Sequence, residues 1–431
     1  MKILVFTVSS WNSKVGANTW ATLLDQYDSA NIANICIRDE IPDSPVCSRY
    51  FNISENKIIK SVFNRKIKTG KEINQKVVQE GNYSNLKTHN ERYRKMKKKR
   101  RYSMLLVREF VWKIGKWKTN ELNNFLDDFK PDIILHSMEG YIHLNRIVEY
   151  SIDRTGAKAI GYIWDDNFTY KQSSDIGYKI YRFFQRKSLK KLAKKTKAFF
   201  AITPKTKREA DDFFGINSVV LSKPLNSITN VTSYENVVYP LEILYTGNLL
   251  IGRDKSLQKI VDILKEIPNI REKIKIEVYT QTELEIDKLS MLSSDFCHIH
   301  PAISQEEVLR KQKKADVLLF LEDIDGKDSK MARLSFSTKI TDYLSSGKCI
   351  FVVGNKDLAP IEYLKDNDAA IVASDIYQIR EKITMLLEDN SVLKKYAKNA
   401  FDCGVKNHAP QLIRERLDRV LKEVIDESRT N

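Results

Sequence analysis

The sequence of 431 residues lacks long apolar runs and has few cysteines. No apolar stretch approaches the roughly 18–20 residues that a membrane-spanning helix needs. The opening residues, MKILVFTVSSWNSK, have a short apolar core and no small-residue cleavage site, which predicts a first strand and not a signal peptide. The five cysteines include no CxxC pair, so a disulfide framework or zinc site is not expected and a cytoplasmic protein is favoured.

Several motifs that carry well-known chemistry are also missing. The chain has no Walker A pattern and no GxGxxG after a predicted strand. The main sequence evidence for a phosphate-loop NTPase or an NAD(P)-dependent enzyme is therefore absent. GxSxG and HExxH are absent too, which removes the signatures of serine hydrolases and zinc proteases.

The positive charge, in contrast, is abundant and concentrated. The net charge is +16. Residues 87–101 carry nine Lys or Arg against one Glu, and residues 179–197 carry nine and no acid, so the rest of the chain is close to neutral. Such patches attract nucleic acid or an anionic membrane surface.

Both basic segments have apolar companions at helical spacing. A basic helix with an apolar opposite face can lie in a bilayer interface. The alternative is that the apolar stripe faces the protein core while the lysines face water. On the first interpretation, the residues that contact the membrane are Lys97, Lys98, Lys99, Arg100, Arg101, Trp112, Trp117, Arg186, Lys187, Lys190 and Lys191.

The first half predicts one α/β domain over residues 1–222, with a basic helical insertion near 60–128. Its strands are expected at 3–8, 34–37, around 129–135, at 157–164 and at 218–222. Residues 223–241 are rich in Asn, Ser and Thr without helical or strand rhythm, which predicts an interdomain linker.

The second half, residues 242–404, alternates regularly between strands and helices. Such alternation implies a parallel sheet covered on both faces. A doubly wound domain of this kind binds ligands where loops leave the carboxyl ends of its strands. The six strands are expected at 242–246, 274–279, 296–299, 316–321, 349–353 and 369–372.

Two polar clusters follow strand ends in this half. The loop YTGNLLIGRDKSL, 245–257, contains Gly247 and Arg253, and SFSTK, 335–339, begins a predicted short helix that ends at Gly347. Unpaired N–H groups at a helix start suit an anion, while Arg adds forked hydrogen bonds and Lys a point charge. Together the clusters predict a diphosphate site, although 335–339 alone is also consistent with an ordinary helix N-cap.

The order of these segments resembles the C-terminal half of GT-B glycosyltransferases. The segments are YTGNLLIGRDKSL, HIHPAISQEEVLRKQKKADVLLFL, SFSTKITDYLSSGKCIF and YAKNAFDCGVKNHAP. The chain is most similar to glycosyltransferase family 4 and its relatives in bacterial surface polysaccharide synthesis. The resemblance implies an α/β fold of two Rossmann-like doubly wound domains facing across a cleft. It also implies that residues 405–431 form a helix that packs back on the N-terminal domain.

The same resemblance implies a donor site for a UDP- or GDP-linked sugar as co-substrate, with no other cofactor. No metal is expected, because neither of the two polar clusters, 245–257 and 335–339, contains a DxD pair. In this scheme Asp342 contacts the ribose, the segment from His300 to Ile303 lies near the base, and the loop around Gly16 closes over the donor. The residues assigned to the donor site are Gly16, Gly247, Asn248, Arg253, Lys255, Ser256, His300, Ile303, Ser337, Thr338, Lys339 and Asp342.

Three acids follow strand ends in the first half: Glu139, Asp165 and Asp166. They could orient or deprotonate an acceptor hydroxyl. For the two aspartates, a helix N-cap or turn is an equal alternative. The expected acceptor is a saccharide, lipid-linked at the inner membrane face, so the chain would be peripheral, with its basic segments on anionic lipid.

One departure from the family leaves other functions open. The family often has two glutamates eight residues apart, but counting back from Asp342 reaches Leu334, with Glu322 a distant substitute. A nucleotide-sugar epimerase or an inactive sugar-nucleotide binder therefore remains an alternative, and transfer with retained configuration is an expectation only. A basic nucleic-acid-binding protein is a rival of another class. The sequence contains no recognisable RRM, KH or helix-turn-helix pattern, so no nucleic acid partner is expected.

Overall fold

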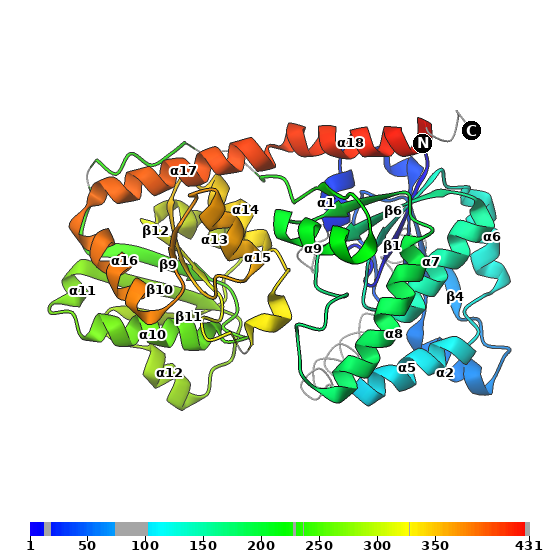
Figure 1. Cartoon of the computed structure of the whole chain (residues 1–431), viewed down its shortest axis with the longest axis horizontal. Coiled ribbons are helices and arrows are strands. Elements are labelled where there is room, and N and C mark those ends of the chain that lie inside the picture. The colour runs from blue at the N-terminus through cyan, green and yellow to red at the C-terminus, as the bar shows by residue number, and fades with distance from the viewer. Residues whose placement is uncertain (13–18, 74–101, 227–229, 236, 327, 427–431) are drawn as a thin grey trace. The chain divides into compact units, whose positions relative to one another are not determined.

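The computed structural model describes residues 1–12, 19–73, 102–226, 230–235, 237–326 and 328–426 (Figure 1). The chain divides into two compact units. Unit 1 consists of Met1–Ile202, Thr206–Leu221 and Arg414–Asn431, and unit 2 of Thr203–Lys205 and Ser222–Ile413. The predicted site residues Gly16 and Lys97–Arg101 lie outside the described residues.

Unit 1 is built on an eight-stranded sheet with the order β4-β3-β2-β1-β5-β6-β7-β8. Every neighbouring pair is parallel except β3 and β4. The central strands are buried on both faces, as expected for a parallel sheet covered by helices. The strands are β1 (Ile3–Thr7), β2 (Ile32–Cys36), β3 (Arg49–Ile53), β4 (Gly70–Ile73), β5 (Ile133–Ser137), β6 (Lys158–Ile163), β7 (Ala198–Ala201) and β8 (Val219–Val220).

The strand β4 corrects the prediction that residues near 60–128 form a helical insertion. This segment adds an antiparallel edge strand to the sheet of unit 1. Its sequence, GKEI, begins with glycine and exposes Lys71 and Glu72, so it carries none of the apolar signal of a buried strand. The helical part of this segment is also not continuous, because Gly115 to Thr119 separate two helices. The Thr119 hydroxyl caps the second helix by accepting from the Leu122 N–H at 3.2 Å.

Helices surround this sheet. They are α1 (Thr19–Leu24), α2 (Glu55–Phe63), α5 (Tyr102–Ile114), α6 (Asn120–Phe129), α7 (Ile142–Thr155), α8 (Ile176–Ala193), α9 (Pro204–Phe214) and α18 (Pro410–Asp426), with a short 3-10 turn at Ser29–Asn31. The side chain of Trp112 is fully buried and stacks on His143 at 4.4 Å between ring centroids, and Trp117 is also buried. The prediction that these two tryptophans contact a membrane is therefore wrong: they belong to the core-facing side of their segment.

Unit 2 is built on a six-stranded parallel sheet with the order β11-β10-β9-β12-β13-β14. Each of the six predicted strands overlaps an observed one. The strands are β9 (Leu241–Thr246), β10 (Ile274–Thr280), β11 (Cys297–Pro301), β12 (Val317–Leu321), β13 (Cys349–Val353) and β14 (Ile371–Ala373). The predicted α/β class is thus confirmed for both units.

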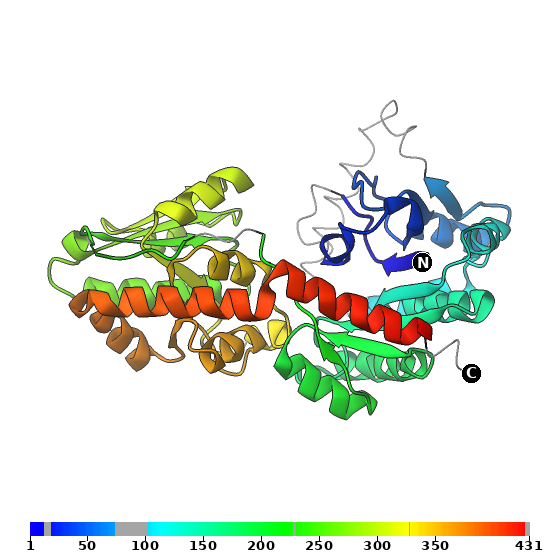
Figure 2. The ribbon, with the colours of Figure 1, turned by 90° about the horizontal axis from the view of Figure 1, so that it is seen from above.

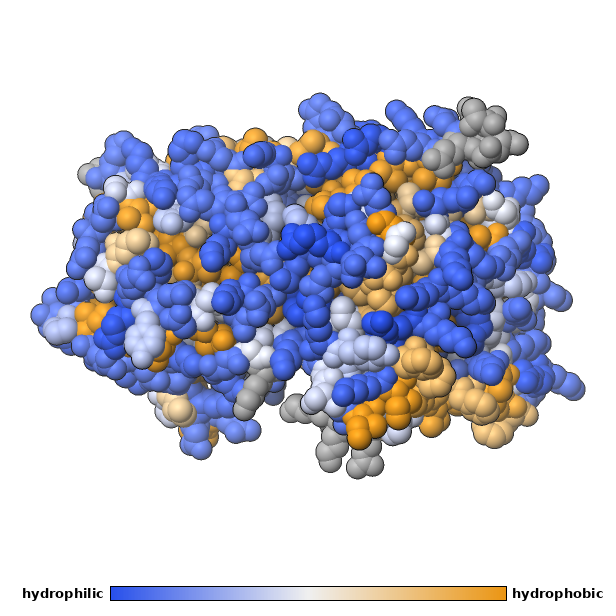
Figure 3. Space-filling view, in the orientation of Figure 1, coloured by the Kyte–Doolittle hydropathy of each residue, from blue (hydrophilic) through white to orange (hydrophobic). Residues whose placement is uncertain are grey.

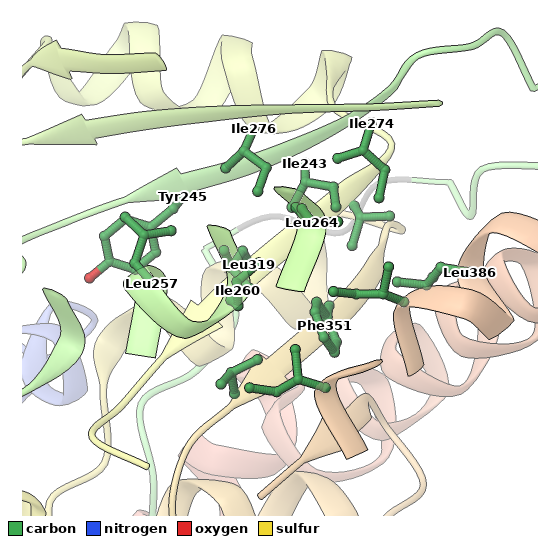
Figure 4. Close-up of a cluster of buried hydrophobic side chains, with 14 of the residues drawn as sticks. Ile243, Tyr245, Leu257, Ile260, Leu264, Ile274, Ile276, Leu319, Phe351 and Leu386 are labelled. Carbon is green, nitrogen blue, oxygen red and sulfur yellow. The ribbon is translucent and has the colours of Figure 1, made fainter. Parts of the chain in front are cut away.

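Helices cover both faces of this second sheet. They are α10 (Arg253–Lys265), α11 (Ile270–Lys273), α12 (Ile286–Leu292), α13 (Gln305–Lys314), α14 (Thr338–Ser345), α15 (Ala359–Asp366), α16 (Ile376–Glu388) and α17 (Asn390–His408), with a 3-10 turn at Ser329–Ala332. Figure 4 shows part of the core, where Ile243 and Ile276 of the sheet lie among Leu257, Ile260 and Leu264 of α10. A second apolar layer, which includes Leu318 and Ile350, lies against α14 and α15.

The strand order of each sheet reverses once along the chain. In unit 2 the chain runs from β9 outward to β11 and then returns to β12, on the other side of β9. In unit 1 the same reversal falls between β1 and β5. Loops at the carboxyl ends of the two strands diverge at such a point, and ligands of doubly wound sheets bind there.

The C-terminal helix α18 follows α17 after a break at Ala409, and the two successive helices are seen in Figure 2. Pro410 opens α18, where its missing N–H costs no intrahelical bond. From Arg414 onward this helix belongs to unit 1. There Tyr27 donates a hydrogen bond to Asp418, and Arg414 donates one to Gln26.

Candidate functional site

The candidate site of unit 2 lies where its strand order reverses. Thr246 and Gly247 follow the neighbouring strand β9, and Glu322 follows β12. The helix α10 begins at Arg253, directly after the loop that leaves β9. Three of the predicted donor residues, Gly247, Arg253 and Lys339, are brought together here by the contacts that follow.

Lys339 reaches from the first turn of α14 to the end of β9. Its Nζ donates a hydrogen bond to the Thr246 carbonyl at 2.9 Å and lies 4.8 Å from the centroid of the Tyr245 ring. Gly247 has a φ of +147°, and a Cβ at this position would lie 2.1 Å from Lys339 Nζ. A glycine is therefore required at 247 if the ammonium group is to sit against the strand end.

The ammonium group of Lys339 is poorly solvated. Burial and, to a smaller extent, the charge of Arg253 lower the pKa of Lys339 to about 8, while Glu322 partly opposes this effect. Two cations thus face one carboxylate at the strand ends. An anion at this position would restore the balance and raise the Lys339 pKa again, because an opposite charge favours the protonated form.

Arg253 is held in a fixed orientation by four hydrogen bonds. Its Nη2 donates to Glu322 Oε1 at 2.8 Å, and its Nε is 3.1 Å from both Glu322 Oε2 and the Leu321 carbonyl. Its Nη1 donates to Asn248 Oδ1 at 2.7 Å. These bonds use the Nε N–H and one N–H of each Nη, so the second N–H groups of Nη1 and Nη2 remain for a ligand.

The Arg253–Glu322 pair is mostly buried, so the variant Arg253→Ala is expected to leave an unpaired carboxylate inside unit 2. We expect a loss of about 3–5 kcal/mol in the free energy of unfolding, the usual cost of removing one partner of a buried pair. Urea denaturation of the variant checks this. The double variant Arg253→Met, Glu322→Gln buries no unpaired charge and should recover most of the loss; an unfolding curve of Arg253→Ala equal to that of the wild type would contradict the expectation.

The start of α14 has the form of a capped helix. The Ser337 hydroxyl accepts from the Lys339 N–H at 3.4 Å, and Thr338 is the first residue of the helix. The ordinary helix N-cap, which is one of the two interpretations that the sequence of 335–339 allows, is therefore present. The cap does not exclude anion binding, because the first turn of a helix has more N–H groups than one hydroxyl can satisfy. Ser337, Thr338 and Lys339 remain predicted donor residues.

Two further predicted donor residues, Lys255 and Ser256, belong to the first turn of α10. Ser256 is fully buried; its hydroxyl donates to the Glu322 carbonyl at 2.7 Å and accepts from the Ile324 N–H at 3.0 Å. The prediction that Ser256 contacts the donor is therefore wrong, because the hydroxyl joins α10 to the segment after β12. Lys255 is exposed and pairs with Asp328 at 3.1 Å, so it lies on the surface of the helix.

The predicted nucleotide contacts lie on other elements of unit 2. Asp342 accepts from Asn226 Nδ2 at 2.8 Å and lies 3.7 Å from Lys223; burial raises its pKa, and Lys223 opposes this. His300 is the penultimate residue of β11, where its Nε2 is 2.5 Å from Glu277 and its ring stacks on Tyr279. Ile303, half-buried, follows in the loop before α13. Among the described residues, no hydrogen bond or ion pair joins the side chains of Asp342, His300 or Ile303 to Lys339 or Arg253.

Glu322 is the main site residue that the sequence did not assign. It was considered only as a distant substitute for a missing family glutamate, whereas the structure places it against Arg253, at the strand end next to Gly247. A sequence signal existed, since Glu322 directly follows the apolar run VLLFL of β12. The pairing itself depends on β9 and β12 being neighbours, which the order of strands along the chain does not reveal.

Acidic side chains gather at the carboxyl edge of the sheet in unit 1. Glu139 follows β5 and is half-buried, and burial raises its pKa to about 7, with Asp165 adding to the effect and Arg38 opposing it. A carboxyl group with such a pKa can accept or release a proton near neutral pH. Asp166 is fully buried and accepts from the Thr169 N–H at 2.9 Å and hydroxyl, so the turn-forming alternative holds for it.

Similar solved structures were found for the whole chain, at low sequence identity. The structure of HepE from Anabaena in complex with UDP has a TM-score of 0.61 at 10% identity, over 98% of this chain and 100% of that one. Sucrose-phosphate synthase from Thermosynechococcus elongatus has 0.61 at 11%, over 99% of each chain. A UDP-forming α,α-trehalose-phosphate synthase from Burkholderia vietnamiensis has 0.58 at 9%, over 98% and 100%. No family model and no curated protein sequence matches the chain.

These likenesses show that the chain has the GT-B fold, which consists of two Rossmann-like α/β units. The fold predicted from the sequence resemblance is therefore confirmed. Membership in glycosyltransferase family 4 stays a prediction. Within the described ranges, no helix is long and apolar enough to cross a bilayer, and no three His, Cys, Asp or Glu side chains are grouped to hold a metal ion.

Proposed function

We propose that the chain is a glycosyltransferase that takes a sugar from a nucleoside diphosphate donor bound in unit 2. The observation that carries this proposal is the cluster at the strand-order reversal: the Lys339 ammonium on the Thr246 carbonyl, a required glycine at 247, and the anchored fork of Arg253. A diphosphate supplies the negative charge that this cluster lacks.

The chemistry of transfer fits the same residues. Cleavage of the bond between sugar and diphosphate leaves negative charge on the diphosphate, while the sugar develops oxocarbenium character. Fixed cations stabilise such a charge best when they are oriented before the reaction, as Arg253 is by Glu322. We assign Lys339 and Arg253 to the leaving diphosphate. No metal takes part in this proposal.

The donor and acceptor are narrower proposals. The similar protein HepE has been solved in complex with UDP and with UDP-glucose, which favours a UDP-linked sugar over a GDP-linked one. The resemblance to family 4 favours retention of configuration. It also favours a lipid-linked saccharide acceptor in bacterial surface polysaccharide synthesis, with the chain peripheral at the inner membrane face. Glu139 of unit 1 is the proposed base or positioning group for the acceptor hydroxyl.

A product assay tests the proposed reaction. The purified chain, in EDTA, would be incubated with UDP- and GDP-linked sugars, with and without a membrane lipid extract as acceptor. We expect release of one nucleoside diphosphate that depends on the extract, together with a glycosylated product whose anomeric configuration NMR can assign. Conversion of the donor into an isomeric nucleotide sugar without release would establish an epimerase instead. No turnover of any donor would contradict the proposal.

A further inference from the structure

The helices α5 and α8 of unit 1 expose an unusual amount of apolar surface. They lie side by side, and the rings of Tyr102 and Tyr178 at their starts are 5.5 Å apart. Figure 3 shows apolar side chains gathered over these helices. Six large side chains, each about half exposed or more, make up this apolar face: Met104, Val107, Phe110, Ile180, Phe183 and Phe184.

The apolar face is distinct from the faces that α5 and α8 pack against the core of unit 1. Each helix buries a different set of side chains against unit 1: α5 buries Trp112, and α8 buries Tyr181, Leu189 and Leu192. The exposed residues therefore form a second apolar stripe, directed at solvent. Contiguous patches of this kind mark contact with another protein or with a membrane, whereas single exposed apolar residues are ordinary.

A pocket of about 410 Å³ opens between α5, α7 and α8, beside the apolar face. Phe110 and Phe184, two members of the apolar face, line it. Its polar lining is dominated by cations. Four basic side chains, set against two carboxylates, belong to it: Lys113, Arg146, Lys187 and Lys191.

Both carboxylates of the pocket already have partners. Glu109 accepts from the backbone N–H of Ile142 at 3.2 Å and of His143 at 2.8 Å, and its Oε1 lies 3.0 Å from His143 Nδ1. Glu149 forms an ion pair with Lys191. These bonds hold both carboxylates in the pocket wall, and the four basic side chains leave the pocket lining with an excess of positive charge.

The remaining cations have no such partners. Among the described residues, none forms an ion pair with Lys113, Arg146 or Lys187, and the Arg146 Nη1 is buried without any hydrogen-bond partner. A buried guanidinium N–H without an acceptor is costly, so an acceptor is expected to reach it in the functional state. Arginine N–H groups pair best with carboxylate or phosphate oxygens.

We propose that this pocket binds the phosphate headgroup of an anionic membrane lipid, while the apolar face enters the bilayer interface. A cationic site bordered by aromatic and aliphatic side chains matches a surface with phosphates above hydrocarbon. The helix α8 contains no acidic residue that a negative membrane would repel. The inference extends the proposed function, because a lipid-linked acceptor requires the enzyme at a membrane, but its test involves no sugar transfer and can fail separately.

Flotation with lipid vesicles tests the headgroup site. We expect the full chain to float with phosphatidylcholine vesicles that contain phosphatidylglycerol and to stay unbound with phosphatidylcholine alone. The variant Lys113→Gln, Lys187→Gln should lower the partition coefficient at least about tenfold, since each basic residue near an anionic surface contributes to binding. Phe183→Asp with Phe184→Asp should abolish flotation, and Arg146→Gln should weaken it while circular dichroism stays unchanged.

A matched pair of substitutions separates the pocket from general charge. Lys130 and Lys422 are exposed residues of unit 1 that do not line the pocket, so Lys130→Gln with Lys422→Gln removes the same net charge. This control should float like the wild type. Equal losses for both pairs, or equal binding to neutral vesicles, would overturn the proposal. So would binding to single-stranded RNA that the pocket variant loses, in the absence of vesicle binding.

Discussion

The variant Lys339→Ala is expected to bind nucleoside diphosphates roughly 10- to 100-fold more weakly than the wild type. The range follows from the loss of one charge-assisted hydrogen bond in a poorly solvated site, about 1.5–3 kcal/mol. The Lys339 ammonium already sits beside the strand end and the charge of Arg253. Isothermal titration calorimetry with UDP and GDP in EDTA measures the change in affinity.

The lysine at 348 provides a matched control. It is buried, its pKa is also lowered by burial, and it precedes β13 at the opposite, amino edge of the same sheet. Lys348→Ala should therefore disturb the packing of unit 2 comparably and leave the affinity for nucleotide unchanged. Equal affinity losses in Lys339→Ala and Lys348→Ala would show that the effect is structural and would remove Lys339 from the donor site.

The same site predicts a pH dependence of nucleotide binding. The pKa of Lys339 is lowered to about 8 in the free protein, and a bound diphosphate raises it. Binding therefore selects the protonated lysine, so affinity is constant below this pKa and falls as the pH rises above about 8. Lys339→Ala should lack this decline. A wild-type affinity that is unchanged from pH 7 to well above 8 would contradict the assignment.

The variant Glu139→Gln is expected to lower sugar transfer by roughly 10²- to 10⁴-fold, the usual contribution of a positioned general base. Burial raises the pKa of Glu139 to about 7, so the wild-type kcat/KM should rise with pH until the carboxyl group is ionised near that value. The glutamine variant should lose this rise and keep the wild-type affinity for nucleotide, because the proposed donor site lies in unit 2. Initial rates across the pH range measure both effects.

An acid at the other edge of the same sheet controls for this result. Asp132 is exposed and immediately precedes β5, whereas Glu139 follows it. Asp132→Asn should therefore leave transfer unchanged. If Glu139→Gln retained full activity and the same pH profile, Glu139 would have no part in the reaction, and the base would have to be sought elsewhere.

The sequence predicted unit 2 better than unit 1, for a physical reason. Strands of a parallel sheet with both faces covered are apolar throughout, and runs such as VLLFL of β12 and CIFVV of β13 stand out between helices. The edge strand β4, in contrast, is short and polar, and periodicity gives no signal for it. What specifies β4 is its pairing with β3, a contact between segments that the sequence pattern does not connect.

The candidate site was predictable where local chemistry determines it. Gly247, Arg253 and Lys339 are predicted donor residues because a glycine, an arginine and a helix start after strands indicate anion binding, and the structure brings these three together. The burial of Ser256 and the partnership of Arg253 with Glu322 were not predictable, because they depend on which strands are neighbours. Likewise, the pattern could not decide which stripe of α5 faces the core: Trp112 does, and Phe110 faces solvent.

The crystal structure of the chain with UDP, grown at saturating nucleotide in EDTA, tests the central claim most directly. The account predicts diphosphate density within hydrogen-bond distance of Lys339 Nζ, at the carboxyl end of β9, with the guanidinium of Arg253 still held by Glu322. Nucleotide bound elsewhere, with the Lys339 ammonium still on the Thr246 carbonyl and no anion beside it, would contradict the donor site proposed here.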